Sequence, residues 1–387
     1  MSNIPAEFDE IRPYSPEELP QVFEELIADP NFQKIIHYIF PSAPFEVIAN
    51  KMRQCKTSFE FQKAFSYNLI KDIEQKCSKG VTINCKVLGD DKQQKFTFIS
   101  NHRDIILDSG FLSVLLLDEG RNTVEIAIGD NLLIYPWIKK LVRINKSFIV
   151  QRALTMRQML ESSARLSRYM HYAIQEKHEN IWIAQREGRA KDSNDRTQDS
   201  ILKMMTMGGE GNIIDRLVGL HIVPLAISYE YDPCDYLKAK EFQLKRDIPD
   251  YKKTTADDLL NMQTGLMGYK GFVHFQTDEC LDTKLMQLDI KQPKQELFTQ
   301  ISALIDKGIH KNYKIYPNNY IAYDLLKKEN RFSDKYTKEE EAGFKKYLKG
   351  QLDKIDLEQK DETFLMEKML IMYANPLINY LAATKEK

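Results

Sequence analysis

Short apolar runs alternate with a helical stretch through the middle of the chain. Four runs rich in β-branched and aliphatic residues have the length of strands: VEIAIG at 124–129, SFIVQR at 147–152, ENIWIAQREG at 179–188 and GLHIVPLAISYEY at 219–231. Between the second and the third run, apolar residues recur three and four positions apart over 154–177, which is the period of an amphipathic helix. Strands that alternate with helices of this length form sheets covered by those helices. We therefore expect an α/β fold with a mixed sheet covered by helices.

Helical periodicity continues on both sides of this region. From 16 to about 79, and again from 291 onward, apolar residues recur three and four apart, and the last strand candidate ends at 277. Because proline lacks the backbone N–H that a helix interior uses, the expected breaks are Pro30, Pro41, Pro44, Pro317 and Pro376. We expect an N-terminal helical region (1–80), an α/β domain (81–285) and a C-terminal helical extension (286–387).

A further strand pattern precedes the first of these runs. In VTINCKVLGDDKQQKFTFIS, residues 81–100, β-branched and aromatic residues alternate with polar ones on both sides of Gly89-Asp90-Asp91. This pattern is typical of a β-hairpin, because Gly and Asp are favoured in tight turns. The second arm of the predicted hairpin ends directly before Asn101 and His102.

Composition excludes several classes of function. The 55 Lys and Arg nearly balance the 56 Asp and Glu, so no global positive field favours nucleic acid as a partner. The five cysteines are an odd number without metal-ligand spacing, which suits reduced thiols in a cytoplasm. The first 20 residues are acidic and carry four prolines, which is not a signal-peptide pattern, and no run of eighteen apolar residues occurs. We expect a cytoplasmic protein whose membrane contact is peripheral, on the inner face of the membrane.

His102 stands between the predicted hairpin and the apolar run that begins at Ile105. The tripeptide HRD is similar to the protein-kinase catalytic loop, but the asparagine required five residues after Asp104 is Ser109, and no Gly-rich loop precedes it. No other histidine forms a ligand pair with His102 at helical or zinc-finger spacing. Taken alone, His102 suits a hydrogen-bonded structural histidine as well as a catalytic base.

Polar residues also stand at the ends of the following strand candidates. Arg152 ends the second run, Glu187-Gly188-Arg189 follows the third, and the fourth carries Pro224 and exits at Tyr229. Because α/β folds place their ligands at the carboxyl ends of the strands, we expect these groups to gather near His102.

This ordered set resembles the glycerolipid acyltransferase superfamily, the glycerol-3-phosphate and 1-acylglycerol-3-phosphate acyltransferases. The resemblance covers roughly residues 97–232, and four matching segments carry it in the order of the family's motifs. They are Asn101-His102 with a following Asp, the strand Phe148-Ile149-Val150-Gln151-Arg152, the turn Ile183-Ala184-Gln185-Arg186-Glu187-Gly188-Arg189, and the apolar run Ile222-Val223-Pro224-Leu225-Ala226-Ile227.

Two spacings depart from the family. Its acid stands after four intervening residues, where this chain has Leu107, while Asp108 lies one position further and Asp104 two positions after His102. We expect Asp108 to be the partner, because it follows an apolar turn that can fold back toward His102, and Asp104 remains the alternative.

The second departure concerns the cations of the third motif. The family has one residue between its Gly and its Arg, whereas Arg189 follows Gly188 directly. Three further cations stand close by in the sequence and are alternatives to it: Arg186, Lys191 and Arg196.

The resemblance implies a role for each of these residues. His102 would be the general base for an acceptor hydroxyl, oriented by the aspartate, and no metal or organic cofactor is implied. Arg152, with Arg186 and Arg189, would bind the acceptor phosphate through paired guanidinium contacts. Glu187 would bond a glycerol hydroxyl or orient an arginine, and Gly188 would let the backbone approach the ligand.

The implied reaction moves a fatty acyl group from acyl-CoA or acyl-carrier protein to glycerol-3-phosphate or lysophosphatidate. The stretch NLLIYPWIKKLVRINK, 131–146, suits contact with the donor's acyl chain or with a bilayer interface, because its aromatic residues adjoin lysines. A core helix with a basic outer face would have the same pattern. Two alternatives remain: acylation of a lyso-aminolipid or another lipid hydroxyl, and a non-catalytic lipid-binding protein on the same fold.

Overall fold

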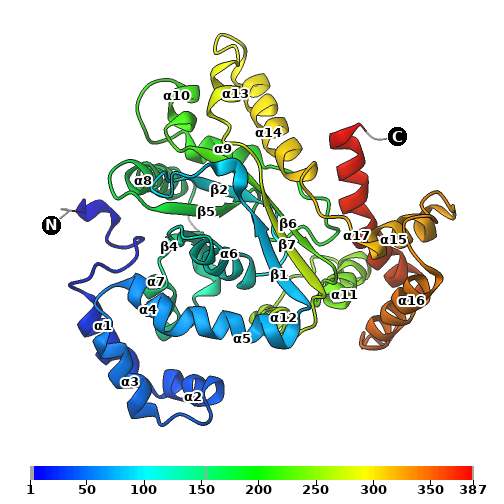
Figure 1. Ribbon diagram of the computed structural model, residues 1–387, viewed down its shortest axis with the longest axis horizontal. Coiled ribbons are helices and arrows are strands. Elements are labelled where there is room, and N and C mark those ends of the chain that lie inside the picture. The colour runs from blue at the N-terminus through cyan, green and yellow to red at the C-terminus, as the bar shows by residue number, and fades with distance from the viewer. Residues whose placement is uncertain (1–3, 153–154, 386–387) are drawn as a thin grey trace.

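A mixed sheet forms the centre of the molecule in the computed structural model, which describes residues 4–152 and 155–385 (Figure 1). The strands are β1 (Gly80–Asn84), β2 (Thr97–Ser100), β3 (Val124–Gly129), β4 (Ser147–Val150), β5 (Asn180–Ala184), β6 (Ile222–Tyr229) and β7 (Phe272–Thr277), in the order β1-β7-β6-β2-β5-β3-β4. From β6 to β4 neighbouring strands are parallel, while β7 is antiparallel to β6 and parallel to β1. The predicted α/β fold with a mixed sheet covered by helices is confirmed.

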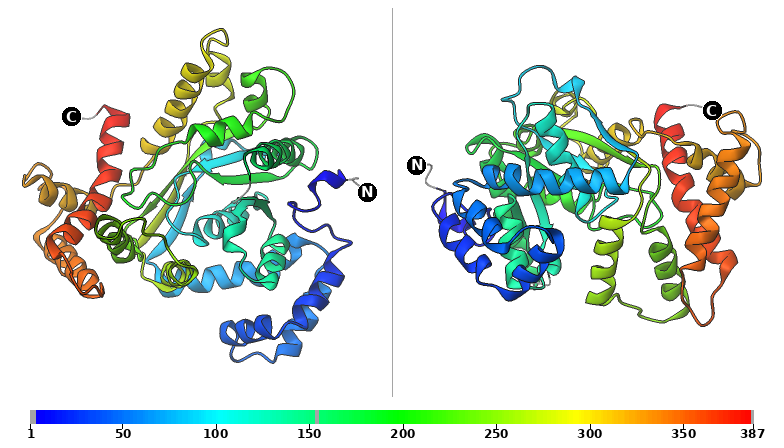
Figure 2. Two further views of the ribbon diagram at one scale, coloured as in Figure 1. Left: turned by 180° about the vertical axis from the view of Figure 1, so that it is seen from behind. Right: turned by 60° about the horizontal axis from the view of Figure 1, so that its bottom comes forward.

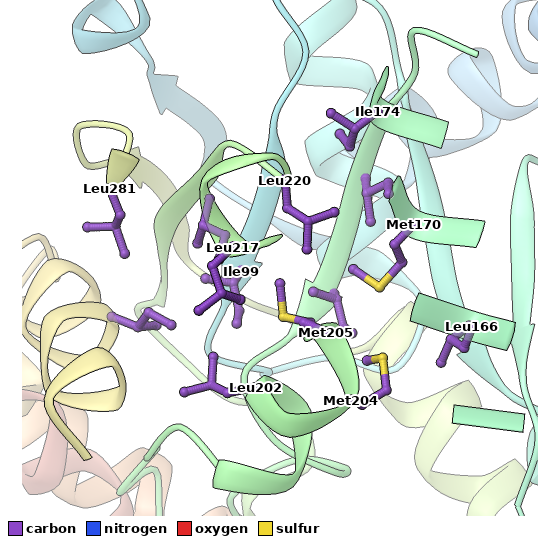
Figure 3. Packing of buried hydrophobic residues seen from close by; sticks show 14 of the residues in the cluster. Ile99, Leu166, Met170, Ile174, Leu202, Met204, Met205, Leu217, Leu220 and Leu281 are labelled. Carbon is purple, nitrogen blue, oxygen red and sulfur yellow. The ribbon is translucent and has the colours of Figure 1, made fainter. Parts of the chain in front are cut away.

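Helices cover both faces of this sheet. Against one face pack α8 (Met156–Gln175), α9 (Asp199–Met205), α10 (Ile213–Val218) and α14 (Lys294–His310), and Figure 3 shows the buried cluster between them and the strands. Against the other face pack α5 (Tyr67–Cys77) and α6 (Leu107–Asp118). The helix predicted over 154–177 corresponds to α8, which Thr155 caps; Leu154 lies outside the described residues.

The remaining helices lie at the two ends of the molecule (Figure 2). At the N-terminal end α1 (Leu19–Ile27), α2 (Pro30–Ile39), α3 (Phe45–Gln54) and α4 (Ser58–Phe61) pack with α7 (Pro136–Ile144). At the C-terminal end α11 (Asp235–Asp247) packs with α15 (Pro317–Lys327), α16 (Lys338–Asp353) and α17 (Glu362–Thr384). Two further helices, α12 (Thr255–Met267) and α13 (Asp282–Met286), flank β7 in the chain. None of the helices in the described part of the chain has the length and apolarity to cross a membrane.

The predicted hairpin at 81–100 is wrong. Strand β1 pairs with β7, while β2 lies between β5 and β6 and pairs with both in parallel. All four residues of β2 are buried, as expected for a central strand whose two edges and two faces are covered. The connection includes a short 3-10 helix at Lys86–Leu88, and the burial of Leu88 and Phe96 holds it against the core. Alternation in a short sequence does not reveal which strand becomes the partner.

The predicted break at Pro376 is also wrong, because α17 continues through it. A proline inside a helix costs about 3 kcal/mol through its missing N–H and its steric clash. Burial on both sides of the proline, at Met372, Tyr373 and Leu377, offsets this cost. The side chain of Asn375 also anchors this turn by donating to the backbone oxygen of Asp192 over 2.7 Å. At the other predicted positions, Pro30 and Pro317 are the first residues of α2 and α15.

Candidate active site

The carboxyl ends of the parallel strands meet at one edge of the sheet, beside a cavity of about 940 Å³. His102 follows β2, Arg152 follows β4, and the turn with Arg186, Glu187, Gly188 and Arg189 follows β5. All six of these residues line the cavity. The structure therefore brings together the polar residues that sequence analysis placed at separate strand ends.

His102 and Asp108 form a hydrogen-bonded pair at the cavity wall. Nδ1 of His102 lies 2.8 Å from Oδ2 of Asp108, which is fully buried in the first turn of α6. The same oxygen accepts from the backbone N–H groups of Arg103 and Asp104, at 2.6 and 3.1 Å. An ionised carboxylate only accepts hydrogen bonds, so Nδ1 carries the imidazole proton and Nε2 keeps its lone pair. This tautomer can take a proton from a group bound in the cavity.

Asp104 has a different position and makes no hydrogen bond with His102. Its Oδ1 accepts from the backbone N–H groups of Ile106 and Leu107, at 2.9 and 2.8 Å, where α6 begins. Burial, and next the neighbouring Asp108, raise the pKa of its carboxyl group. Asp108 stands one position beyond the acid of the family's motif. The turn that Asp104 closes takes up this extra residue and lets Asp108 reach back to the imidazole.

Asn101, which directly precedes His102, and Trp182 on the neighbouring strand β5 fix the place of the imidazole. The side-chain amide of Asn101 pairs with the backbone of Ile227 through two hydrogen bonds of 2.8 Å, which extends the β2–β6 ladder by one residue. Trp182 of β5 lies edge-on to the His102 ring, with 5.5 Å between the ring centroids. Its indole N–H donates to Ser100 Oγ over 3.0 Å. Sequence analysis missed Trp182, because its approach to His102 depends on the β2–β5 pairing.

Tyr229, at the end of β6, lies beside the buried carboxylates. Its hydroxyl and Oδ1 of Asp108 are both buried. Burial, followed by the charges of Asp108 and Asp104, raises the pKa of Tyr229 well above its ordinary value. The phenol is therefore neutral at physiological pH and adds no negative charge to the aspartate pair.

An ion pair joins the second and third motifs. Nη1 of Arg152 lies 3.1 Å from Oε1 of Glu187, and the backbone N–H of Arg152 points at the carboxylate of Asp130, 3.2 Å from both oxygens. Gly188 has a φ of +66°, a left-handed conformation that favours glycine, and open space lies where a Cβ would stand. The turn therefore exposes its backbone toward the cavity.

The cations near this turn differ in their availability. Arg186 lines the cavity and has no hydrogen-bond or ion-pair partner among the described residues, whereas Nη2 of Arg189 donates to Asn261 of α12 over 3.0 Å. Arg196 does not line the cavity, and its guanidinium bonds His310 and Asn379 at 3.2 and 2.8 Å. Arg152 and Arg186 are thus the cations most open to a ligand in the cavity.

The rest of the cavity wall is largely apolar. It includes Ile106, Gly110 and Val114 along α6 and its approach, and Ile126 and Ile128 of β3. The side chains of the stretch 131–146 face two different environments. Trp137, Ile138 and Leu141 of α7 line the cavity, whereas Lys140 forms an ion pair with Glu25 of α1 at 2.7 Å. The helix is thus a wall of the cavity, while Lys140 and the buried Arg143, which donates to the backbone oxygens of Arg12 and Asp9, bind it to the N-terminal segment.

One group in the described residues has the side chains of a metal site. The donor atoms of His221, Cys280 and Asp282 lie within 4.8 Å of one another. His221 directly precedes β6, at the amino end of that strand, whereas His102 follows the carboxyl end of the parallel strand β2. This group is therefore separate from the cavity.

Gly265 of α12 lies against the carboxylate of Asp104. A Cβ on residue 265 would stand 2.0 Å from Oδ2 of Asp104, and the other oxygen of that carboxylate is held by two backbone N–H groups. We expect Gly265→Ala to lower the free energy of unfolding by about 1 to 3 kcal/mol, through overpacking. Denaturant unfolding measures the change, and Gly343→Ala in α16 is the control, because a Cβ there meets no atom within 4 Å. Equal stability of the two variants would contradict the contact.

A known protein family and a solved structure resemble parts of this chain. Residues 84–228 match the family described as Acyltransferase. No curated protein matches the chain in sequence. Among solved structures, the 1-acyl-sn-glycerophosphate (LPA) acyltransferase PlsC from Thermotoga maritima aligns over 76% of this chain and 96% of its own, with 12% sequence identity and a TM-score of 0.38. The matched segment 84–228 contains His102, Asp108, Arg152 and the turn at Gly188, and over this segment the chain is similar to the Acyltransferase family.

Proposed function

We propose that this protein transfers a fatty acyl group from a thioester carrier, acyl-CoA or acyl-carrier protein, to a hydroxyl of glycerol-3-phosphate or lysophosphatidate. The observation that carries the proposal is the His102–Asp108 pair at the wall of a cavity of about 940 Å³. This volume lies at the upper end of the usual range of ligand cavities, roughly 300 to 1,000 Å³.

The pair supports general-base catalysis without an enzyme nucleophile. Nε2 of His102 takes the proton of the acceptor hydroxyl while its oxygen attacks the thioester carbonyl carbon. The buried carboxylate of Asp108 stabilises the resulting imidazolium. The tetrahedral intermediate then collapses, the C–S bond breaks, and the leaving thiolate takes from Nε2 the proton that came from the acceptor hydroxyl. An ester and a free thiol leave, so atoms and charge balance.

The cations at the cavity suit the phosphate of the acceptor. Arg152 and Arg186 carry guanidinium groups whose planar donors match phosphate oxygens in pairs. Arg152 is paired with Glu187 at 3.1 Å, so the phosphate would share or displace that carboxylate. We assign Glu187 to a glycerol hydroxyl or to the orientation of Arg152. Arg189, whose guanidinium donates to Asn261, has a smaller role in phosphate binding than Arg186.

The apolar wall suits the fatty acyl chain, and the cavity mouth suits a lipid surface. Met159 lines the cavity, and its neighbours at the start of α8, Met156 and Leu160, are 81% and 60% exposed. A cluster of exposed apolar side chains beside the cavity could insert into the interface of a bilayer. We therefore place the reaction at the inner face of a membrane, with the chain bound peripherally from the cytoplasm.

The alternative within the same chemistry is a lyso-aminolipid or another lipid hydroxyl as acceptor. It is favoured by one observation, the existing pairing of Arg152 with Glu187, which reduces the charge available to a phosphate. An acylation assay with a panel of acceptors tests both: glycerol-3-phosphate, lysophosphatidate and a lyso-aminolipid, each with acyl-CoA and acyl-carrier protein. Absence of transfer to every acceptor would leave the lipid-binding alternative in place of an enzyme.

Arg152→Ala probes the acceptor phosphate. A charge-assisted contact made in both the ground state and the transition state contributes to binding more than to turnover. We expect the KM for glycerol-3-phosphate or lysophosphatidate to rise roughly tenfold or more, with a smaller fall in kcat and little change in donor KM. Arg168→Ala is the control, since Arg168 of α8 pairs with Glu7 near the N-terminus and does not line the cavity. An unchanged acceptor KM, with uncharged lipids acylated equally well, would favour the alternative acceptor.

A further inference from the structure

Three lysines converge on one carboxylate beside the cavity. Glu241 of α11, whose side chain is 5% exposed, forms ion pairs with Lys191, with Lys245 at 3.0 Å and with Lys253 at 2.9 Å. These lysines come from the loop after β5, from α11 and from the segment before α12. Among the described residues, Asp258 is the one other acidic group within 4.0 Å of any of these lysines, at 3.9 Å from Lys253, so three ammonium groups pair with two carboxylates.

Two of the three lysines face the space where the substrates would react. Lys191 and Lys253 line the same cavity as His102, whereas Lys245 does not and is half exposed. Burial lowers the pKa of Lys191 to about 8, against the opposing effect of Glu241, because ammonium groups are poorly solvated there. A bound anion would stabilise the charge that Glu241 leaves unbalanced.

We propose that Lys191 and Lys253 bind the phosphate that ends the pantetheine arm of the acyl donor, a group that coenzyme A and acyl-carrier protein share. Glu241 holds the two ammonium groups in place. This site rests on the proposed acyl transfer for its biological ligand, but phosphate binding itself does not depend on that activity.

Position favours the donor over the acceptor as the source of this phosphate. The cavity holds two sets of cations that differ in their partners: Arg152 and Arg186 follow the ends of β4 and β5, whereas Lys191, further along the loop after β5, is joined to Lys253 through Glu241, and Arg189 between them donates to Asn261. The proposed reaction has two substrates, each with a phosphate, that must reach His102 together. With the arginines assigned to the acceptor, the lysine group is left for the donor.

The test measures binding and kinetics with the full chain. Isothermal titration calorimetry compares coenzyme A, 4′-phosphopantetheine and pantetheine on the wild type, Lys191→Gln, Lys253→Gln and the double variant. We expect the first two ligands to lose roughly tenfold or more in affinity in the double variant, while pantetheine, which lacks the phosphate, does not change. Lys245→Gln is the matched control, since it removes a partner of Glu241 outside the cavity.

Kinetics give an independent readout. The donor KM should rise in the double variant with both acyl-CoA and acyl-carrier protein, and the acceptor KM should stay within about threefold. A rise in acceptor KM alone, or equal effects of Lys245→Gln, would overturn the assignment while leaving acyl transfer intact. Conversely, phosphate-dependent binding in a protein that acylates no acceptor would uphold the site and reject the proposed function. If the double variant unfolds, the proposal is tested with the single variants and with the preference of the wild type for 4′-phosphopantetheine over pantetheine. Equal binding of these two ligands by the wild type would overturn the proposal.

Discussion

His102→Ala should lose at least about 100-fold in acyl transfer while the protein stays folded. An acceptor hydroxyl has a pKa far above neutrality, so it attacks a thioester slowly unless a base removes its proton as the bond forms, an effect typically worth about 100-fold to 10,000-fold. Nε2 of His102 is the ring nitrogen left for that proton, because Nδ1 is bonded to Asp108. The loss should appear in kcat and in kcat/KM, since the proton transfer belongs to the transition state.

The controls separate catalysis from folding. The His102 side chain is 13% exposed at the cavity wall, so its removal leaves the apolar clusters in place, and thermal unfolding should change little. His37→Ala on α2 is the matched variant, because that histidine is exposed and does not line the cavity. Full activity in folded His102→Ala protein would remove this mechanism.

Asp108→Asn should have the second largest effect, a loss of roughly 100-fold to 10,000-fold in kcat. Oδ2 of Asp108 accepts from His102 and from two backbone N–H groups, so the carboxylate holds both the imidazole and the turn that carries it. With its oxygen in the place of Oδ2, the amide would still accept from both backbone N–H groups and from Nδ1–H, but as a weaker acceptor than a carboxylate. The amide also lacks the charge that stabilises the imidazolium.

Asp104→Asn is the natural control for this variant. Its side-chain oxygen can still accept from the N–H groups of Ile106 and Leu107, so activity should stay within about threefold of the wild type. A comparable loss in both variants would point to disruption of the shared turn, whereas loss in Asp104→Asn alone would restore Asp104 as the catalytic partner.

The Asp104→Asn substitution should also change the stability of the protein in a pH-dependent way. The folded-state pKa of Asp104 is raised, so the folded protein favours the protonated carboxyl group and becomes less stable, relative to the unfolded chain, as pH rises through that pKa. Asp104→Asn should therefore raise the melting temperature at neutral pH. The gain should vanish below about pH 4, the ordinary range of an aspartate, where the carboxyl group is protonated in both states. Melting curves across this range measure the difference.

Most strands and helices of this chain are predictable from the sequence, but their neighbours are not. Strand β3 coincides with VEIAIG, and the other runs predicted β4 to β7 to within a few residues, because hydrophobic period and β-branched residues are local properties. The pairing of β2 with β5 and β6, in place of a hairpin with β1, was not predictable in this way. Register depends on which surfaces are buried together, and local alternation is the same for either partner. Continuation of α17 through Pro376 likewise depends on its buried contacts.

By itself, the sequence determined which side chains stand at the carboxyl ends of the strands, and hence that His102, Arg152 and the turn at Gly188 would meet at one edge of a parallel sheet. Only the tertiary structure decided that Asp108 bonds the imidazole, because the turn closed by Asp104 sets the direction of α6. It also decided that Arg196 lies outside the cavity and that Lys253, distant in sequence, lines it beside Lys191. The contacts of Arg196 and Lys253 join segments far apart in the chain, and a chain's local pattern contains no information on which distant surfaces will pack against each other.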